Sequence, residues 1–244
     1  MAEPNIRLGA TATPSAAIDA GLRTYMLRVY NYMTVGTAIT GLTAWLVANT
    51  ALFNLFYQVR DGFLVQTPLG WIAMFSPIVF VLALSFGINR MKASTIQLLF
   101  WVVTIVYGIS LSSILLTYTG TSVARVFFIT AGLFGAMSLY GYTTKRDLTK
   151  IGSFLIMGAI GVILAMVVNW FIASTMLDFV ISVAGVLVFT GLTAYDTQKI
   201  KNGYDAVSHS GELMTKGAIS GALNLYLDFL LIFIFLMNLL GNRN

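Results

Sequence analysis

Two aspartates in this sequence lie where a carboxylate is costly. Asp228 is the only charged residue between Lys216 and Arg243, and Asp196 ends the uncharged run that follows Asp178. A carboxylate within an apolar membrane segment costs several kcal/mol unless it faces water, a counter-charge or a shared proton. Each side chain therefore needs a specific partner or a function.

The residues around each aspartate predict a polar stripe on a helix that faces the protein interior. Thr193 falls on roughly the same helical face as Asp196, and Asn224 lies one turn before Asp228. Two carboxylates that meet in a medium of low dielectric constant do not both ionise freely, so they titrate as a pair. When ionised, they offer the hard oxygen ligands that Ca²⁺ prefers, and protons compete for the same oxygens. The simpler interpretations are that Asp196 reaches the lipid headgroups and Lys199, and that Asp228 makes a structural hydrogen bond.

The composition excludes a soluble domain. Of the 244 residues, 58% are hydrophobic and 9% are charged, whereas a soluble domain carries about 25% charged residues. The chain has no Cys and one His, which excludes disulfides, thiolate zinc sites and cysteine nucleophiles. Its net charge of +5 is more typical of the cytoplasmic loops of a membrane protein than of a nucleic-acid-binding surface. We expect the lipid bilayer as its surroundings and no nucleic-acid partner.

The spacing of the charged residues predicts an all-α, polytopic membrane protein with seven transmembrane helices. A helix needs about 20 mostly apolar residues to cross the hydrocarbon core. Seven runs come close to this length or exceed it, and the last one is interrupted only by Asp228. These runs lack the alternating pattern of lipid-facing β-strands. The predicted spans are residues 30–55, 70–89, 95–118, 124–142, 151–173, 177–197 and 217–240.

The basic residues orient the predicted bundle, because cytoplasmic loops keep an excess of Lys and Arg. With the N-terminus in the cytoplasm, eleven of the fourteen basic residues lie on the inner side, and Arg60, Arg125 and Arg243 lie outside. Seven spans then leave the C-terminus on the outer side of the membrane. Residues 1–28 are predicted to form a cytoplasmic polar tail, not a secretory signal peptide, and residues 29–242 a single seven-helix bundle.

We do not expect enzyme chemistry. The sequence has no phosphate-binding glycine motif and no zinc-protease motif, and no His or Lys lies where it could activate the serines of the third span. The segment between Asp196 and Lys216 is predicted to be a solvated cytoplasmic loop. In that loop His209 lies near Asp205 and Glu212, which is weak evidence for a metal site. We expect no resident cofactor.

The sixth and seventh spans carry two distinctive strings. They are Ala194-Tyr195-Asp196-Thr197-Gln198-Lys199-Ile200 and Leu225-Tyr226-Leu227-Asp228-Phe229. With seven short-looped spans and a cytoplasmic N-terminus, these strings make the chain resemble the Bax inhibitor-1 family, in its bacterial branch, from about residue 25 onward. The resemblance implies a multi-pass protein of the bacterial inner membrane, whose seventh helix is central and wrapped by the other six.

The resemblance also implies roles for charged residues. In prokaryotic relatives a carboxylate pair is the pH-sensing element of a calcium leak pathway, and Asp196 and Asp228 match that pair by position. A basic residue that ends the second span can latch one carboxylate in such relatives, and Arg90 is similar in place. Lys92 is the alternative latch, and a plain topological anchor is the other interpretation of Arg90.

One spacing departs from this expectation. If Lys201 and Lys216 lie at equal depth, Asp228 lies farther above Lys216 than Asp196 lies above Lys201. The difference corresponds to about two turns, or about 10 Å, of helix. Contact between the two aspartates then requires that the seventh helix begins deeper in the cytoplasm, that it kinks, or that the two lysines differ in depth.

These inferences predict a pH-sensitive, passive Ca²⁺ leak conduit. Asp196 and Asp228 would bind protons and transient Ca²⁺, supported by Thr193 and Asn224, and no ATP-binding motif or obvious inverted repeat suggests active transport. The alternative is a membrane-embedded modulator of a partner such as a membrane quality-control protease, contacted through the N-terminal tail. Deletion of residues 1–24 would abolish the modulator role and leave ion flux intact, whereas Asp228→Asn would do the opposite.

Overall fold

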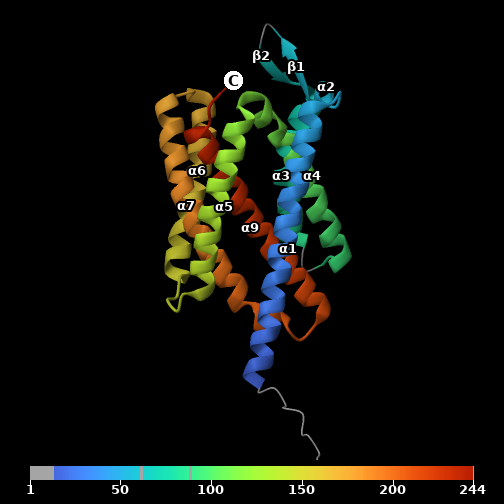
Figure 1. The fold of residues 1–244 in the computed structure, drawn as a ribbon, viewed down its shortest axis with the longest axis vertical. Helices are drawn as coiled ribbons and strands as arrows, with labels where there is room; N and C mark the ends of the chain where they lie inside the picture. The colour runs from blue at the N-terminus through green and yellow to red at the C-terminus, as the bar shows by residue number, and fades with distance from the viewer. Residues whose placement is uncertain (1–13, 61–62, 88–89, 244) are drawn as a thin grey trace, which may run out of the picture.

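The computed structural model describes residues 14–60, 63–87 and 90–243, and most of them are helical (Figure 1). The described residues form seven long helices. These are α1 (Pro14–Asn49), α3 (Pro68–Gly87), α4 (Ala93–Thr117), α5 (Gly120–Thr143), α6 (Thr149–Ile172), α7 (Thr175–Asn202) and α9 (Gly211–Leu240). Two single-turn helices, α2 (Phe53–Phe56) and α8 (Tyr204–Val207), lie between them.

Several of these helices are suited to a membrane. Within the described residues, five are long and apolar enough to cross it, namely α4, α5, α6, α7 and α9, and α3 contains a shorter apolar stretch, Pro68–Leu84. The predicted helical class is therefore confirmed, and each predicted span coincides with a long helix. Membrane crossing by α1 and α3, and with it the total of seven spans, stays a prediction.

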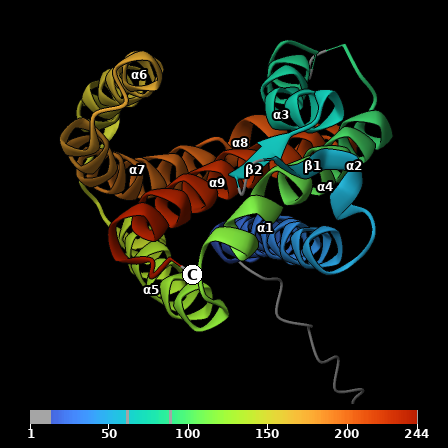
Figure 2. The same cartoon turned by 90° about the horizontal axis from the view of Figure 1, so that it is seen from above.

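Helix α9 runs through the middle of the bundle (Figures 1 and 2). Helices α1, α4, α5 and α7 pack on it, whereas α3 packs on α4 and α6 packs on α7, on the outside. More than half of the apolar segment of α9 is buried, at least twice the share of each other candidate span among the described residues. The expectation of a central last helix is confirmed, with the difference that α3 and α6 form an outer layer.

The first connection contains a β-hairpin that the apolar pattern did not predict. Strands β1 (Tyr57–Arg60) and β2 (Phe63–Gln66) pair antiparallel, with Tyr57 opposite Gln66 and Arg60 opposite Phe63. The hairpin projects from the end of the bundle at which the chain ends (Figure 1). Such short strands leave too brief a pattern to distinguish from a loop.

The end of the chain is fastened to the connection between α4 and α5. The backbone N–H of Thr119 donates to the Asn242 carbonyl (3.0 Å), and the N–H of Asn242 donates to Ser122 Oγ (3.0 Å). Arg125 donates to the Leu240 carbonyl at the end of α9 (3.2 Å). These bonds hold the last turn of the central helix in place.

On the other side of the bundle, helices extend beyond two predicted boundaries. Helix α1 begins at Pro14, so residues 14–28 of the predicted polar tail are helical, and residues 1–13 lie outside the described part. The predicted polar loop between Asp196 and Lys216 is mostly helical, because α7 continues to Asn202 and α9 begins at Gly211, before the predicted start at residue 217.

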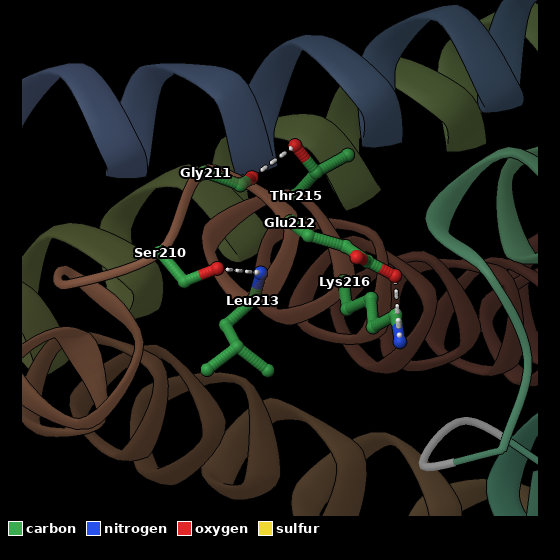
Figure 3. A network of polar contacts seen from close by, with 6 residues as sticks. All are labelled: Ser210, Gly211, Glu212, Leu213, Thr215 and Lys216. Atoms are coloured by element: carbon green, nitrogen blue, oxygen red, sulfur yellow. Dashed lines mark hydrogen bonds and ion pairs between the residues drawn. The ribbon is translucent and has the colours of Figure 1, made fainter.

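Local bonds explain the early start of α9 (Figure 3). Ser210 has an extended backbone, and its hydroxyl accepts a hydrogen bond from the Leu213 N–H (3.5 Å), the arrangement of a helix N-cap. One turn further, Lys216 forms an ion pair with Glu212 (3.0 Å). An acidic residue in the first turn also suits the positive end of the helix dipole.

Candidate functional site

Asp228 lies near the middle of α9, inside the bundle. It is 4% exposed, and its Oδ2 has no hydrogen-bond partner among the described residues. The simple interpretation of a structural hydrogen bond therefore does not account for this oxygen. Since a buried carboxylate without a partner is costly, the side chain is suited to bind a proton or a cation.

Asp196 lies in α7, which neighbouring helices hold through two close contacts beside it. Gly141 of α5 approaches the Ala194 carbonyl so closely that a Cβ there would overlap it, and Gly152 of α6 lies under the Tyr195 ring. Glycine allows such approaches because it has no side chain. The half-buried Asp196 is thus carried on a helix whose position is fixed from two sides.

Two contacts set the register of the antiparallel helices α7 and α9. Ile200 lies on Gly221 and Phe235 lies on Gly185. Because the helices are antiparallel, a residue of α7 is level with a residue of α9 when their two numbers add to 420 or 421. Asp196 is therefore level with residues 224 and 225, and Asp228 with residues 192 and 193. The two aspartates are offset by about one turn, or about 6 Å along the helix.

This register explains the spacing that the sequence left open. The offset is smaller than the roughly 10 Å expected for lysines at equal depth, because α9 begins deeper and Lys216 and Lys201 differ in depth. Asp196 is close enough for its charge to act on Asp228. The structure thus brings the two predicted carboxylates within electrostatic range of each other.

The two supporting polar residues lie at the same levels as the aspartates. By the same register, Thr193 is level with Asp228 and Asn224 is level with Asp196. Thr193 is fully buried, and its hydroxyl donates to the Phe189 carbonyl (2.9 Å), while Asn224 is half-buried. Each aspartate is therefore level with a polar residue of the neighbouring helix.

The basic residues lie at different distances from this pair. Lys199, one turn after Asp196, acts electrostatically on it. Arg90 is exposed in the turn between α3 and α4, and no described contact joins its side chain to either aspartate. Lys92 of the same turn acts on Glu212 at the start of α9.

Because Lys92 lies near Glu212, the position of Glu212 on α9 shows how far the turn between α3 and α4 is from Asp228. Glu212 lies in the first turn of α9, and the helix rises about 24 Å from there to Asp228. The turn that holds Arg90 and Lys92 therefore lies at the end of the bundle, well below the aspartates. The structure does not bring the proposed latch to the carboxylates that it would hold.

Metal coordination at this site would need help from water. Among the described residues, no group of three or more His, Cys, Asp or Glu lies together, and this includes His209 with Asp205 and Glu212. Ca²⁺ takes six to eight oxygen ligands, and the pair supplies at most four. The arrangement suits a passing, partly hydrated cation better than a resident one.

A row of hydrogen-bonded side chains beside the pair could not be predicted from the sequence. Tyr30 Oη of α1 and Ser138 Oγ of α5 are 2.6 Å apart, and Ser138 Oγ lies 3.0 Å from Thr197 Oγ1. Thr197 in turn donates to the Thr193 carbonyl (2.8 Å). Since Tyr30, Ser138 and Thr197 lie on three helices that are far apart in the sequence, no local sequence pattern predicts these hydrogen bonds.

The sequence comparisons assign the chain to a family. A family model described as "Inhibitor of apoptosis-promoting Bax1" matches residues 22–244. The chain belongs to the Bax inhibitor-1 family. The resemblance of the two strings is thereby confirmed.

Bacterial relatives match over almost their full length. The chain is 46% identical over 234 residues to the uncharacterized protein RP147 of Rickettsia prowazekii, covering 96% of this chain and 95% of that protein. It is 44% identical over 225 residues to the inner membrane protein YbhL of Escherichia coli K12, covering 92% and 94%. An uncharacterized protein of Caulobacter vibrioides is 43% identical over 229 residues, covering 93% and 92%. A membrane protein of the bacterial Bax inhibitor-1 type is thus supported.

In this Bax inhibitor-1 protein, other members of the first string fix the connection between α5 and α6. The Gln198 amide accepts from the Leu148 N–H (2.8 Å) and donates to the Arg146 carbonyl (2.8 Å). Lys201, just beyond the string, donates to the Tyr142 carbonyl (2.7 Å). These residues position α7, and with it Asp196.

Tyr226, the tyrosine of the second string, positions α9. Tyr226 is fully buried, and its hydroxyl lies 2.6 Å from that of Thr40, which also contacts the Thr104 carbonyl (2.8 Å). The rings of Phe100 and Tyr107 pack edge-on against Tyr226. Helices α1 and α4 therefore hold the central helix just before Asp228.

Proposed function

We propose that this Bax inhibitor-1 protein is a pH-sensitive, passive conduit for Ca²⁺ in the bacterial inner membrane, gated by Asp196 and Asp228. The observation that carries the proposal is the pair itself. Two carboxylates on packed helices lie within range of each other's charge, and one of them is buried with an oxygen that has no partner among the described residues.

Repulsion between the carboxylates supplies the gating chemistry. When both are ionised, their repulsion in a poorly hydrated site is relieved by a cation or a proton between them. Carboxylate oxygens bind Ca²⁺, whereas a protonated carboxyl offers weaker ligands. Protons and Ca²⁺ therefore compete for the pair, and the flux of Ca²⁺ depends on pH.

The proposed conduit requires that all seven long helices cross the membrane, with the N-terminus in the cytoplasm. The start of α1 and the end of the chain lie at opposite ends of the bundle (Figure 1), as an odd number of crossings requires. Arg60, Arg125 and Arg243 belong to the end that carries the hairpin and the C-terminus. The connections rich in Lys and Arg lie at the opposite end, which is cytoplasmic by the positive-inside rule.

The test is Ca²⁺ uptake into liposomes that contain the purified full-length protein and a Ca²⁺-sensitive dye. We expect flux down the gradient that changes between about pH 5 and 8, because the pair exchanges its proton for Ca²⁺ over such a range. Asp228→Asn and Asp196→Asn should each flatten the pH response, since Asn is nearly isosteric and does not titrate. Asp205→Asn, at an exposed position of α8, is the matched control and should behave like the wild type.

Two results would overturn the proposal. One is wild-type flux equal to that of protein-free liposomes at every pH. The other is a normal pH response in both Asp228→Asn and Asp196→Asn, with both proteins folded, as judged by their elution as single species in detergent.

A further inference from the structure

A groove runs between α1 and α5 on the side of the bundle away from α3. Two cavities make it up, of about 580 and 670 Å³, and they share Tyr30 and Phe134 as lining residues. Both helices pack on α9, whose Phe229 lines the second cavity. The hydrogen bond between Tyr30 and Ser138 joins the two walls. Each cavity falls in the range of about 300–1,000 Å³ that is typical of small-molecule sites.

The groove is apolar along its length and positive at one end. Arg23 lines the first cavity at the end where α1 begins, and none of the described lining residues of either cavity is acidic. Farther along, most of the lining residues are Met, Leu, Ala, Gly or Phe, with Tyr30, Thr34 and Thr37 between them. A cation followed by an apolar channel is complementary to an anionic amphiphile.

The dimensions match one leaflet of a bilayer. From Arg23 to Met33, which lines the second cavity, α1 rises about 15 Å. This is half the thickness of a hydrocarbon core of about 30 Å. With Arg23 at the headgroup level, an acyl chain of the same leaflet reaches the second cavity.

The walls are also open to a ligand. A Cβ added to Gly135 of α5 or to Gly41 of α1 would meet no atom within 4 Å, although both glycines line the groove. Leu27 and Leu139, from the two walls of the first cavity, are 52% and 63% exposed. On a membrane-spanning bundle such exposed apolar side chains face lipid.

We propose that this groove binds one anionic phospholipid, with its phosphate at Arg23 and one acyl chain between α1 and α5. The guanidinium provides paired N–H donors for phosphate oxygens, and the aromatic and aliphatic walls accommodate the chain. Neither aspartate of the pair lines the groove, and the proposal does not depend on the proposed Ca²⁺ flux.

The test is native mass spectrometry of the delipidated full-length protein in detergent. The probes are dioleoyl phosphatidylglycerol and dioleoyl phosphatidylcholine, which have the same chains and differ in net charge. We expect one phosphatidylglycerol to bind several-fold more tightly than phosphatidylcholine. Arg23→Gln should reduce this preference about fivefold, because one basic residue at the membrane surface contributes about that much to anionic lipid binding. Arg28→Gln, on the same helix but outside both cavities, is the control and should keep the preference.

A second pair of variants tests the apolar part of the groove. Gly135→Leu places a side chain in the open space and should weaken binding of both lipids, with Gly135→Ala intermediate. Gly161→Leu makes the same change on α6, where the added side chain also meets open space, and should bind both lipids as the wild type does. Thermal unfolding in detergent checks that all variants are folded.

The proposal is overturned if the wild-type protein binds the two lipids equally, because Arg23 then does not distinguish the anionic headgroup from the neutral one. It is also overturned if folded Gly135→Leu binds both lipids as Gly161→Leu does, since the acyl chain then lies elsewhere.

Discussion

Ile200 of α7 lies on Gly221 of α9, and this contact helps to set the depth of Asp196 relative to Asp228. A Cβ on Gly221 would come within 3.0 Å of the Ile200 side chain, so the helices approach closely only because position 221 has no side chain. One turn above Ile200 lies Asp196, and two turns above Gly221 lies Asp228. The glycine that permits the close approach is thus a positioning residue for the carboxylate pair.

The contact between Gly141 and Ala194 is expected to be essential for stability. In Gly141→Val the new side chain would overlap the Ala194 carbonyl, which cannot move without displacing α7. We expect a loss of about 1–3 kcal/mol, as for other overpacked positions. Unfolding in a detergent titration measures it. Gly132→Val, on the same helix where an added Cβ meets nothing within 4 Å, is the control; an equal loss in both variants would show that strain in α5 itself, not the contact with α7, is responsible.

The two aspartates are expected to act as one unit. Because Asp196 acts on Asp228, either single change to Asn already removes the shared site. The double variant Asp196→Asn/Asp228→Asn should therefore add little to the effect of the single variants on the pH dependence of Ca²⁺ flux. Fully additive effects in the liposome assay would instead indicate two independent sites.

Arg90 is expected to act as a topological anchor, because its turn lies about 24 Å along α9 from Asp228. Arg90→Lys and Arg90→Ala should both leave the flux and its pH dependence unchanged. The latch that the family resemblance implies predicts otherwise. Lys keeps the charge but lacks the planar guanidinium that binds a carboxylate through two hydrogen bonds. A shifted pH response in Arg90→Lys would therefore show that Arg90 acts as a latch and not only as an anchor.

The end of the chain is expected in the periplasm. Alkaline phosphatase, which is active only there, should be active when fused after Asn244 and inactive when fused after Arg146, in the connection between α5 and α6. An inactive fusion after Asn244 would mean an even number of crossings. The helix that carries Asp228 would then not be a simple transmembrane span.

Asp147, which lies outside the membrane-spanning helices, is expected to contribute pH-dependent stability. Its carboxylate accepts hydrogen bonds from Thr149 Oγ1 (2.6 Å) and from the Thr149 N–H (2.9 Å), and these bonds hold its pKa below the usual value. A carboxyl group whose pKa is lowered by folding adds stability above its unfolded pKa of about 4 and loses it as the pH falls through the folded value.

The corresponding variant is Asp147→Ala. It should unfold at a lower temperature than the wild type at pH 6, and the difference should shrink as the pH falls below about 4. Asp205→Ala, which removes an exposed aspartate on α8, is the control. A difference that stays constant down to pH 3 would show that the charge of Asp147 does not stabilise the start of α6.

The long helices could be predicted because their cause is local. A chain that crosses a membrane must satisfy its backbone hydrogen bonds within each segment, so an uncharged run of sufficient length predicts a helix wherever it occurs. Asp228 and Asp196 could be identified for a similar local reason, because a charged side chain within an apolar membrane segment costs free energy. The hairpin and the helical residues 14–28 and 211–216 were missed, because short strands and polar helical turns carry no such signal.

The sequence by itself therefore determined a helical membrane protein with two costly carboxylates, and only the tertiary structure decided that they approach each other. The depth of α7 against α9 depends on which side chains fit together, Ile200 on Gly221 and Phe235 on Gly185, and such fits join residues far apart in the chain. The same holds for the distance between Arg90 and the pair, and for the groove between α1 and α5. Packing between helices is a property of two surfaces at once, and a pattern along one segment does not contain it.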